Sequence, residues 1–536
     1  MTAHRLPIVL AALVAAMAVA SATMAAADTA GAAAAQTDAA APSPAFDVLE
    51  YRVVGNSTLE VRDIERTVYP FLGPGRSMKD VEGARVALEA LYHDRGYNTV
   101  FVDIPEQNVD DGVVRLHVAE GKLRRVAVTG ARYFAGRDIK AALPAAQVDS
   151  VPHLPSLQTE LKDLNTQTPD RTVVPVLRAG PVPGTVDLTL KVDDKLPLHA
   201  SVEVNNQRTA DTEPLRVLAS LSYDNLFSRL DSLSLQYQTA PQDRSQVDVL
   251  AAGYTRRLGA SGANLAMVYI DSKSDVATVG TLGVLGKGKI YGLHFTQPLA
   301  AESTGSAAFS AGLDLKQFAQ SIVVDPNSTV QTPISYVNWS TGFSMSHSGA
   351  HQWTFNSTAN FGMRGVRNDV NEFANKRFLA RPNYFYLRSD ASYLVPLPAK
   401  FTMLLRAAGQ YSVEPLISNE EFAIGGADSV RGYLEAEELG DIGVHSTVQF
   451  GSPNLPLLAE RLQFTAFVFF DGARVSAIDP LPGEPSNVAL RSWGAGFNFA
   501  APWGFAGSLT WADPLLDASH TLRGDSRLLF MVRASW

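Results

Sequence analysis

The chain has 536 residues, of which 46% are hydrophobic and 18% are charged, and its formal net charge is −9. Because no basic stripe is available to neutralise phosphates, this charge argues against a nucleic-acid partner. The chain has no cysteine, which excludes disulfides, thiolate metal sites and a lipidated N-terminal cysteine. Beyond the N-terminus no apolar run is long enough for a spanning helix, so the low charged share favours a membrane protein built of strands.

The first 45 residues are expected to lie outside the folded domains. Residues 1–27 predict a secretory signal peptide, with an apolar segment from Ile8 to Val19 and a run of alanines before Asp28 that is typical of a cleavage site. An uncleaved anchor is the alternative, but no stop-transfer flank follows the apolar segment. Residues 28–45, which are rich in alanine and proline, predict a disordered leader, and whether they form a plug helix stays open.

Residues 46–121 and 122–195 carry the same predicted order of elements, namely a strand, two helices and two strands. In the first repeat Leu88 and Tyr92 belong to an apolar face at helical spacing, and Gly96 ends that helix. We expect helices at 60–72, from 80 to the stop at 96, at 136–143 and at 156–165. We expect strands at 48–54, 97–104, 113–118, 123–128, 171–177 and 186–192.

Residues 196–536 predict a transmembrane antiparallel β-barrel of about sixteen strands. The connections after even-numbered strands are short, such as 259–261 and 348–350, whereas several after odd-numbered strands are long, such as 366–382 and 414–439. Outer-membrane barrels have short periplasmic turns and longer outer loops, and a soluble sandwich has no reason to sort its connections in this way. The expected strands are 199–207, 215–225, 231–240, 246–258, 262–272, 289–299, 305–317, 334–348, 351–365, 383–396, 400–413, 440–452, 461–473, 490–501, 504–513 and 526–536.

Alternation along the strands also fits a barrel wall. In the strand 231–240, Leu233, Leu235 and Tyr237 face one way, and the intervening polar residues face the other. The last strand ends at the aromatic Trp536, which resembles the signal read by the barrel-assembly machinery. Ordinary alternation that happens to end in tryptophan is the alternative interpretation.

The long connection 414–439, called loop 6 below, contains the run Val430, Arg431, Gly432 and Tyr433. An arginine is always charged and is costly when unpaired inside a barrel, so it needs a carboxylate that accepts its two parallel N–H groups. Gly432 permits a tight turn where a side chain would clash, and Tyr433 offers a flat apolar body with a polar tip. If loop 6 lies inside the barrel, its arginine is therefore expected to have a carboxylate partner there.

A later strand supplies the candidate partner, in a motif whose defining residues are Phe467, Phe470, Asp471 and Gly472. By strand alternation the carboxylate of Asp471 faces the lumen, while Phe470 faces lipid. We therefore predict that Arg431 pairs with Asp471. In the alternative interpretation, Arg431 is a solvated loop arginine and Asp471 begins a turn.

Three stretches of the first repeat resemble the first polypeptide-transport-associated (POTRA) domain of the two-partner secretion transporters, the ShlB/FhaC/HecB-type haemolysin secretion and activation proteins. The stretches are VVGN with the leucine and isoleucine that follow it, DVEGARVALEALYHDRGY, and IPEQNVDDGVVRLHVAEGKL. The second repeat resembles the second POTRA domain of this family more loosely, and a generic α+β adaptor pair is the alternative. In this family the sixth outer loop carries a VRGY/F motif and folds back into the lumen, and a later strand carries F-x-x-F-D-G. Residues 430–433 and 467–472 match both motifs, so the resemblance implies that loop 6 folds into the lumen.

The resemblance implies a pore in the Gram-negative outer membrane. Its POTRA domains would recognise an unfolded exoprotein in the periplasm, and its barrel would secrete that client. A small sheet with an open edge strand accepts an extended chain by strand addition, which places the client at Tyr97, Val100 and Val102 or at Val174 and Val176. The outer-membrane bilayer and the barrel-assembly machinery are further expected partners, and no cofactor and no nucleotide are expected.

Two other functions stay open, an insertase for other barrels and, with less support, a gated porin. More POTRA repeats would be expected in an insertase. We find no G-x-S-x-G or H-E-x-x-H element that would support an enzyme, and His347 and His351 flank a tight turn without a third metal ligand, so no metal site is expected. Glu435, Glu437 and Glu438 are expected to be solvated, or else to line a pore mouth.

Overall fold

The computed structural model describes residues 45–109, 111–210, 212–259, 261–274, 276–279, 282–285, 287–299, 304–319, 321–325, 328–457 and 462–536. The predicted signal peptide, and the predicted leader up to residue 44, lie outside these ranges. The chain forms two compact units, of which the first holds the chain up to Arg124 together with Asp149–Pro155 and Ala179–Val186, and the second holds the rest. This division does not test the predicted domain limits at 121 and 195, which stay predictions. None of the described helices is both long and apolar enough to cross a bilayer.

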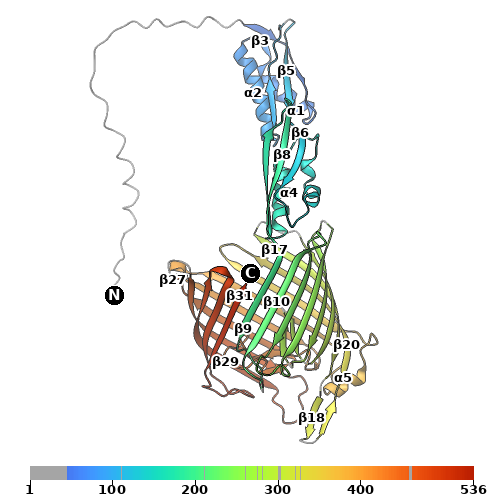
Figure 1. Ribbon diagram of the computed structural model, residues 1–536, viewed down its shortest axis with the longest axis vertical. Helices are drawn as coiled ribbons and strands as arrows, with labels where there is room; N and C mark the ends of the chain where they lie inside the picture. The colour runs from blue at the N-terminus through green and yellow to red at the C-terminus, as the bar shows by residue number, and fades with distance from the viewer. Residues whose placement is uncertain are drawn as a thin grey trace, which may run out of the picture. The chain divides into compact units, whose positions relative to one another are not determined.

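The first repeat forms a three-stranded sheet in the order β2-β5-β4, accompanied by two helices (Figure 1). Leu88 and Tyr92 are buried in the core between the helices and the sheet, as the helical spacing predicts. Helix α2 begins two residues before its predicted start because Ser77 and Asp80 form a capping box. The elements are β1 (Phe46–Val48), β2 (Glu50–Val54), α1 (Val61–Val68), η1 (Tyr69–Phe71), β3 (Gly73–Arg76), α2 (Met78–Asp94), β4 (Val100–Asp103) and β5 (Val113–Glu120).

The second repeat has the same strand, two helices and two strands, and a 3₁₀ turn lies between the helices in both repeats. Only the first repeat adds the paired short strands β1 and β3. Its sheet has the order β6-β8-β7, so β7 is an edge strand in the same way that β4 is an edge of the first sheet. Helix α4 buries Leu157, Leu161 and Leu164, which recur every three or four residues. The elements are β6 (Lys122–Thr129), α3 (Gly136–Ala141), η2 (Pro144–Ala146), α4 (Leu154–Thr166), β7 (Arg171–Ala179) and β8 (Thr185–Asp194).

The rest of the described chain forms a closed antiparallel barrel of 16 strands, which confirms the predicted count (Figure 1). The last strand pairs with the first, and Ala200 and Trp536 exchange two backbone hydrogen bonds, of 2.9 and 3.0 Å, across this closure. A short strand, β27 (Leu455–Leu457), also pairs with β28. The wall strands are β9 (Leu198–Asn205), β10 (Arg216–Leu226), β11 (Asp231–Thr239), β12 (Asp248–Leu258), β13 (Ala263–Ser272), β16 (Gly288–Pro298), β17 (Gly305–Phe318), β20 (Ile334–His347), β21 (Gln352–Gly362), β22 (Phe385–Pro396), β23 (Thr402–Ser412), β26 (Ile442–Gly451), β28 (Leu462–Ser476), β29 (Asn487–Ala501), β30 (Phe505–Pro514) and β31 (Arg527–Ser535).

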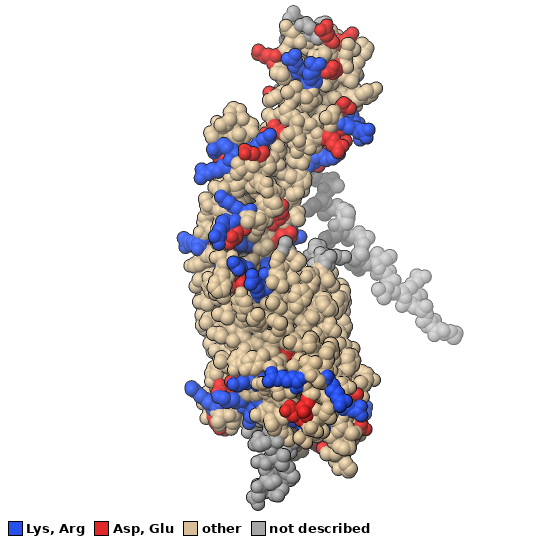
Figure 2. Space-filling model, turned by 90° about the vertical axis from the view of Figure 1, so that its right-hand side faces the viewer, with Lys and Arg blue, Asp and Glu red and all other residues tan. Residues whose placement is uncertain are grey.

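The outer surface of the barrel carries an apolar band. Leu233, Leu235 and Tyr237, which the alternation places on one face of β11, are all exposed. The face drawn in Figure 2 has a belt without lysine, arginine, aspartate or glutamate around the barrel, and charged side chains gather on either side of that belt. Such a belt suits the hydrocarbon layer of a membrane, where charged side chains on the lipid face are destabilising.

The connections between wall strands alternate in length, as predicted. Short turns such as η3 (Pro398–Lys400) and η4 (Pro502–Gly504) join one set of neighbouring strands. The long connections at the other end contain elements of their own, which are β14 (Val276–Val279), β15 (Leu282–Leu285), β18 (Ser321–Asp325), β19 (Ser328–Gln331), α5 (Val370–Lys376), β24 (Phe422–Ile424) and β25 (Glu438–Gly440). Loop 6 is the connection that contains β24 and β25.

Candidate functional site

Loop 6 is a hairpin that lies against the inner wall of the barrel. Its strands β24 and β25 pair in an antiparallel register, with Ile424 opposite Glu438. Beyond this pairing the chain turns at Gly425 and Gly426, both of which have positive φ, and continues to the motif at 430–433. Val430 is fully buried in one apolar cluster with Val475 of β28 and Leu490 of β29. The hairpin is thus packed onto the wall by its own apolar side chains.

The tip of loop 6 places Arg431 on Asp471 of β28. Arg431 Nε lies 2.8 Å from Oδ2 of Asp471 and Nη2 lies 2.9 Å from Oδ1, so the two side chains meet in the fork geometry expected for this pair. The backbone N–H of Arg431 donates a third hydrogen bond to Oδ2, at 3.1 Å. The aspartate side chain is 0% exposed and the arginine side chain is 12% exposed, so water screens the pair little.

Two further side chains hold the guanidinium, and the sequence motif names neither. Phe469 lies beneath it, with Arg431 Cζ 3.4 Å from the ring centroid, which is cation–π geometry. Arg431 Nη1 donates to Oε1 of Gln449 on β26, at 2.8 Å. Phe469 could have been found by strand alternation, since it lies two residues before Asp471 on the same face. Gln449 carries no such signal, because only the register of β26 against β28 brings it opposite Phe469.

The remaining motif residues divide between the loop and the two faces of the wall. Gly432 has a φ of +98°, and a Cβ added there would lie 3.3 Å from Ala512 Cβ, so the position favours glycine on two counts. The hydroxyl of buried Tyr433 lies 2.8 Å from the carbonyl oxygen of Leu516 and donates to it. On β28 the alternation places Phe467 inside and Phe470 outside, where Phe470 is 49% exposed, while Gly472 sits in the strand ladder.

The acidic residues after the motif are not a solvated stretch, so that expectation is wrong for Glu437. Its carboxylate is buried and accepts hydrogen bonds from the backbone N–H of Leu434, at 3.1 Å, and from the hydroxyl of Thr521, at 2.9 Å. Glu435 is partly buried and accepts a hydrogen bond from the backbone N–H of Ala427. These carboxylates hold the turn of loop 6 in shape because each one satisfies a buried backbone donor.

The predicted client-binding residues lie on edge strands or beside them, but their side chains differ in accessibility. Val100 and Val102 of β4 face the core of the first repeat and are buried. Tyr97 precedes that strand and packs against the same core. Val174 of β7 is exposed, and Val176 of the same strand is partly buried. A role of β4 in client binding would therefore rest on its backbone rather than on these two valines.

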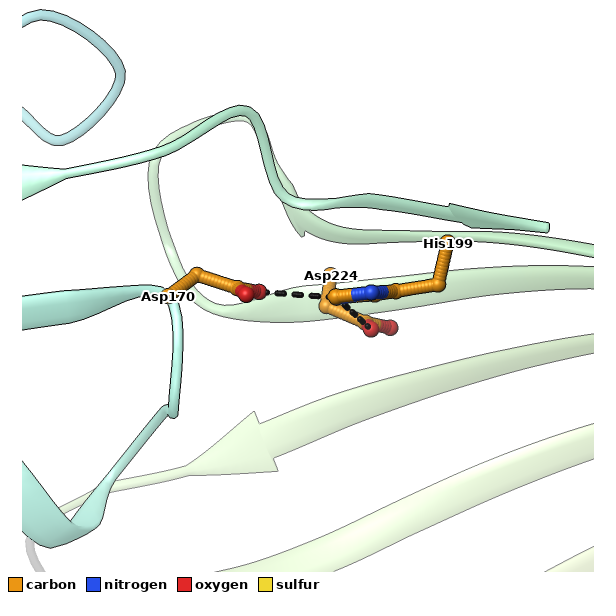
Figure 3. A group of neighbouring side chains, drawn as sticks. All are labelled: Asp170, His199 and Asp224. Atoms are coloured by element: carbon orange, nitrogen blue, oxygen red, sulfur yellow. Dashed lines mark hydrogen bonds and ion pairs between the residues drawn. The ribbon is translucent and has the colours of Figure 1, made fainter. Parts of the chain in front are cut away.

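A group that sequence reasoning missed joins the turn before β7 to the first two barrel strands (Figure 3). His199 Nε2 on β9 lies 2.9 Å from Oδ2 of Asp170 and 3.5 Å from Oδ2 of Asp224 on β10. One imidazole nitrogen and two carboxylate oxygens are ligands that a divalent metal accepts. However, Lys195 Nζ lies 3.3 Å from the other oxygen of Asp170 and already places a cation beside that buried carboxylate. These side chains form a group of ion pairs that links the turn before β7 to the barrel strands. No residue spacing in the sequence predicts this group.

Comparison with known proteins identifies the family. A family model described as haemolysin secretion/activation protein ShlB/FhaC/HecB matches residues 184–499, which is more than half of the 536 residues. The chain belongs to this family. A model of the ShlB-type POTRA domain matches residues 46–121 of the transporter.

The transporter is also similar to individual proteins along most of its length. It is 24% identical over 501 residues to the outer membrane transporter CdiB of Dickeya dadantii, covering 87% of this chain and 83% of that protein. It is 20% identical over 484 residues to the heme/hemopexin transporter protein HuxB of Haemophilus influenzae, covering 88% and 84%. The solved structure of CdiB from Escherichia coli matches with a TM-score of 0.60 at 20% identity, covering 94% of this chain and 93% of that one.

Together these matches confirm the main expectations from the sequence. The transporter is an outer-membrane β-barrel whose POTRA region lies in the periplasm. Its function is the secretion of a partner protein across the outer membrane. The roles of the individual residues at the tip of loop 6 and on the POTRA edges stay predictions.

Proposed function

We propose that the transporter receives an unfolded exoprotein at the edge strands of its POTRA sheets and passes it through the barrel lumen while loop 6 is held at the wall by Arg431 and Asp471. The observation that carries this proposal is the three-bond contact between these two residues, in which a loop cation meets a wall carboxylate inside the barrel. Removing one partner of such a buried ion pair is strongly destabilising, because the other charge is left buried without a countercharge. The pair can therefore hold the loop in one defined position.

The POTRA edges offer the client backbone groups to pair with. β4 pairs with β5 on one side only, and β7 is likewise the last strand of its sheet. An extended segment of the client can add to either edge through main-chain hydrogen bonds. On β4 the exposed ring of Phe101, 62% accessible, supplies an apolar contact. In β7, Pro175 removes one backbone N–H, so β4 has the more continuous edge.

The lumen contains a cavity through which the client can pass. A cavity of about 690 Å³ is lined by residues of the strands from β9 to β17 and of β31, which include the polar Ser201, Ser220, Gln236 and Asp314 and the apolar Ile270 and Ile290. Short hydroxyl and amide side chains can exchange hydrogen bonds with a passing backbone without burying large apolar groups of the client. We propose that transport needs no catalytic residue, no cofactor and no nucleotide bound to this chain, and that its direct partners are the exoprotein, the bilayer and, during biogenesis, the barrel-assembly machinery.

The test is co-expression of the transporter with a candidate exoprotein client, measuring exoprotein in the medium and assembled barrel in the membrane. Arg431→Ala is expected to reduce secretion at least tenfold at an equal barrel level. Arg431→Lys is also expected to fail, because lysine lacks the fork that matches a carboxylate. The matched control is Arg474→Ala, three residues after Asp471 on β28, where the arginine is exposed. Normal secretion by Arg431→Ala would overturn the proposed role.

The same strains separate secretion from barrel insertion. If the transporter acted on other barrels, deleting it would lower the levels of unrelated outer-membrane proteins. We expect those levels to stay unchanged while the exoprotein accumulates inside the cell. A general loss of outer-membrane proteins would instead support an insertase.

A further inference from the structure

The base of loop 6 is held by a second, partly buried arginine, which the motif at the tip does not include. Arg377 follows helix α5 in the preceding long connection, which spans 366–382. Its Nη1 lies 2.7 Å from Oδ1 of Asp441 and its Nη2 lies 2.8 Å from Oδ2, so the two side chains form a second fork. Asp441 is the last residue before β26, where loop 6 returns to the wall, and its side chain is fully buried.

The same guanidinium reaches the other end of loop 6. Arg377 Nη1 donates to the carbonyl oxygen of Leu416, at 2.6 Å, shortly after the chain leaves β23. It also forms an ion pair with Glu421, just before β24. Its Nη2 donates to the carbonyl oxygen of Ile478 at 3.3 Å, in the next long connection. One side chain therefore contacts the departing and the returning segment of loop 6, together with a neighbouring loop.

The carboxylate of Asp441 also accepts two backbone hydrogen bonds. Its Oδ1 accepts a hydrogen bond from the backbone N–H of Leu416, at 2.7 Å, and its Oδ2 accepts one from the backbone N–H of Ile478, at 2.6 Å. Each oxygen thus receives one backbone donor and one guanidinium donor. Because Asp441 is fully buried, loss of Arg377 would leave it without a countercharge in a place where water cannot replace one.

A neighbouring residue anchors the same region to the wall. Glu420 accepts a hydrogen bond from Lys316 Nζ of β17, at 2.6 Å, and one from the hydroxyl of Tyr386 of β22, at 2.6 Å. The hydroxyl of Tyr336 of β20 bonds to the same carboxylate. These partners come from the wall strands, whereas Arg377 comes from an outer connection. Of these contacts, the one made by Arg377 is therefore the one that a movement of residues 366–382 would break.

We propose that Arg377 is a positioning residue that clamps the two ends of loop 6 together and so sets the position from which Arg431 reaches Asp471. The clamp couples the 366–382 connection to loop 6, because loop 6 cannot leave the inner wall of the barrel without breaking the hydrogen bonds of Arg377. This inference rests on the proposed role of loop 6 in secretion, but its geometry is independent of the tip.

The experiment uses the absence of native cysteine to place a single reporter. Ser418→Cys puts a thiol at the partly buried base of loop 6, and its rate of reaction with a membrane-impermeant maleimide is measured in assembled full-length protein. Adding Arg377→Ala is expected to raise that rate at least tenfold and to increase channel openings in planar bilayers. Arg377→Lys, which keeps the charge but loses the fork, is expected to lie between. Arg364→Ala, which removes an exposed arginine before α5, is the matched control and is expected to behave like the parent.

The outcomes separate this proposal from the proposed function. If Arg377→Ala labels and conducts like its parent, the clamp is wrong, whatever the parent secretes. If the parent secretes no exoprotein but Arg377→Ala still labels faster, the clamp stands and the proposed function fails. Heat-modified migration in gels reports barrel assembly. Should Arg377→Ala not assemble, Arg377→Lys decides alone, and labelling equal to the parent would overturn the proposal.

Discussion

The tip and the base of loop 6 are each held by an arginine–aspartate ion pair, but the side that supplies the arginine differs. At the tip, the loop supplies Arg431 and the wall supplies a fully buried aspartate. At the base, Asp441 lies where loop 6 rejoins the wall, and a neighbouring connection supplies Arg377. The tip is therefore fixed to a wall strand, whereas the base is fixed to another outer connection. The two contacts share no residue, so each can be removed by mutation to learn what the other holds alone.

The largest effect is expected from Asp471→Asn, which breaks the tip and leaves the base intact. The change keeps the size of the side chain but leaves Arg431 without its countercharge, and removing one partner of a buried ion pair costs about 3–5 kcal/mol. We expect the loop tip to leave the wall, with secretion reduced at least tenfold and longer openings in planar bilayers. Labelling of Ser418→Cys at the base should change much less. A rise in Ser418→Cys labelling as large as the one expected for Arg377→Ala would show that loop 6 moves as one body.

A smaller effect, confined to the base, is expected from pH. Burial raises the pKa of Glu421 to about 7, Asp441 and Glu484 act in the same direction, and Arg377 opposes them. Because this pKa lies above that of an unfolded glutamate, the contribution of Glu421 to the stability of the base is fully present below about pH 4.5 and is lost as the pH rises toward 7. The loss is roughly 1.4 kcal/mol for each pH unit between these two values.

The rate of maleimide reaction at Ser418→Cys measures this loss once it is corrected for the thiolate fraction on an unfolded peptide. The corrected rate should rise at least tenfold between about pH 5 and pH 7.5. Glu421→Gln should flatten the profile, because an amide does not titrate. A profile that keeps its slope in Glu421→Gln would assign the titration to another group.

The smallest effect is expected from Tyr433→Phe at the tip. It removes a hydroxyl that bonds to the backbone of Leu516, while the buried ring remains. A hydrogen bond of this kind contributes about 0.5–1.5 kcal/mol, so we expect a modest rise in channel noise and secretion within threefold of the parent. A loss as large as that of Asp471→Asn would mean that the tyrosine, rather than the ion pair, fixes the tip.

The barrel and the tip could be predicted from the sequence because both leave local patterns. Alternation along β28 places Asp471 inside, and the lengths of the connections reveal which loops lie on which side. The base leaves no such pattern, because Arg377 and Asp441 are far apart in the chain and each looks like a solvated loop charge. The expectation for Glu437 is wrong for the same reason, since only the folded loop shows that its carboxylate accepts buried backbone donors. Long-range register, not local pattern, positions these groups.

The position of loop 6 also makes the barrel lumen asymmetric. The tip of loop 6 lies on the inward residues of β26 and of β28 to β30, while its base reaches β17 through Glu420. The open cavity borders β9 to β17 and β31. With loop 6 in place, an extended polypeptide that passes through the barrel would contact the serine-rich side of the lumen. It would not contact the phenylalanine-rich side. Photo-crosslinkers at Ser220 or Gln236 would then capture cargo that a probe beside Phe469 would miss.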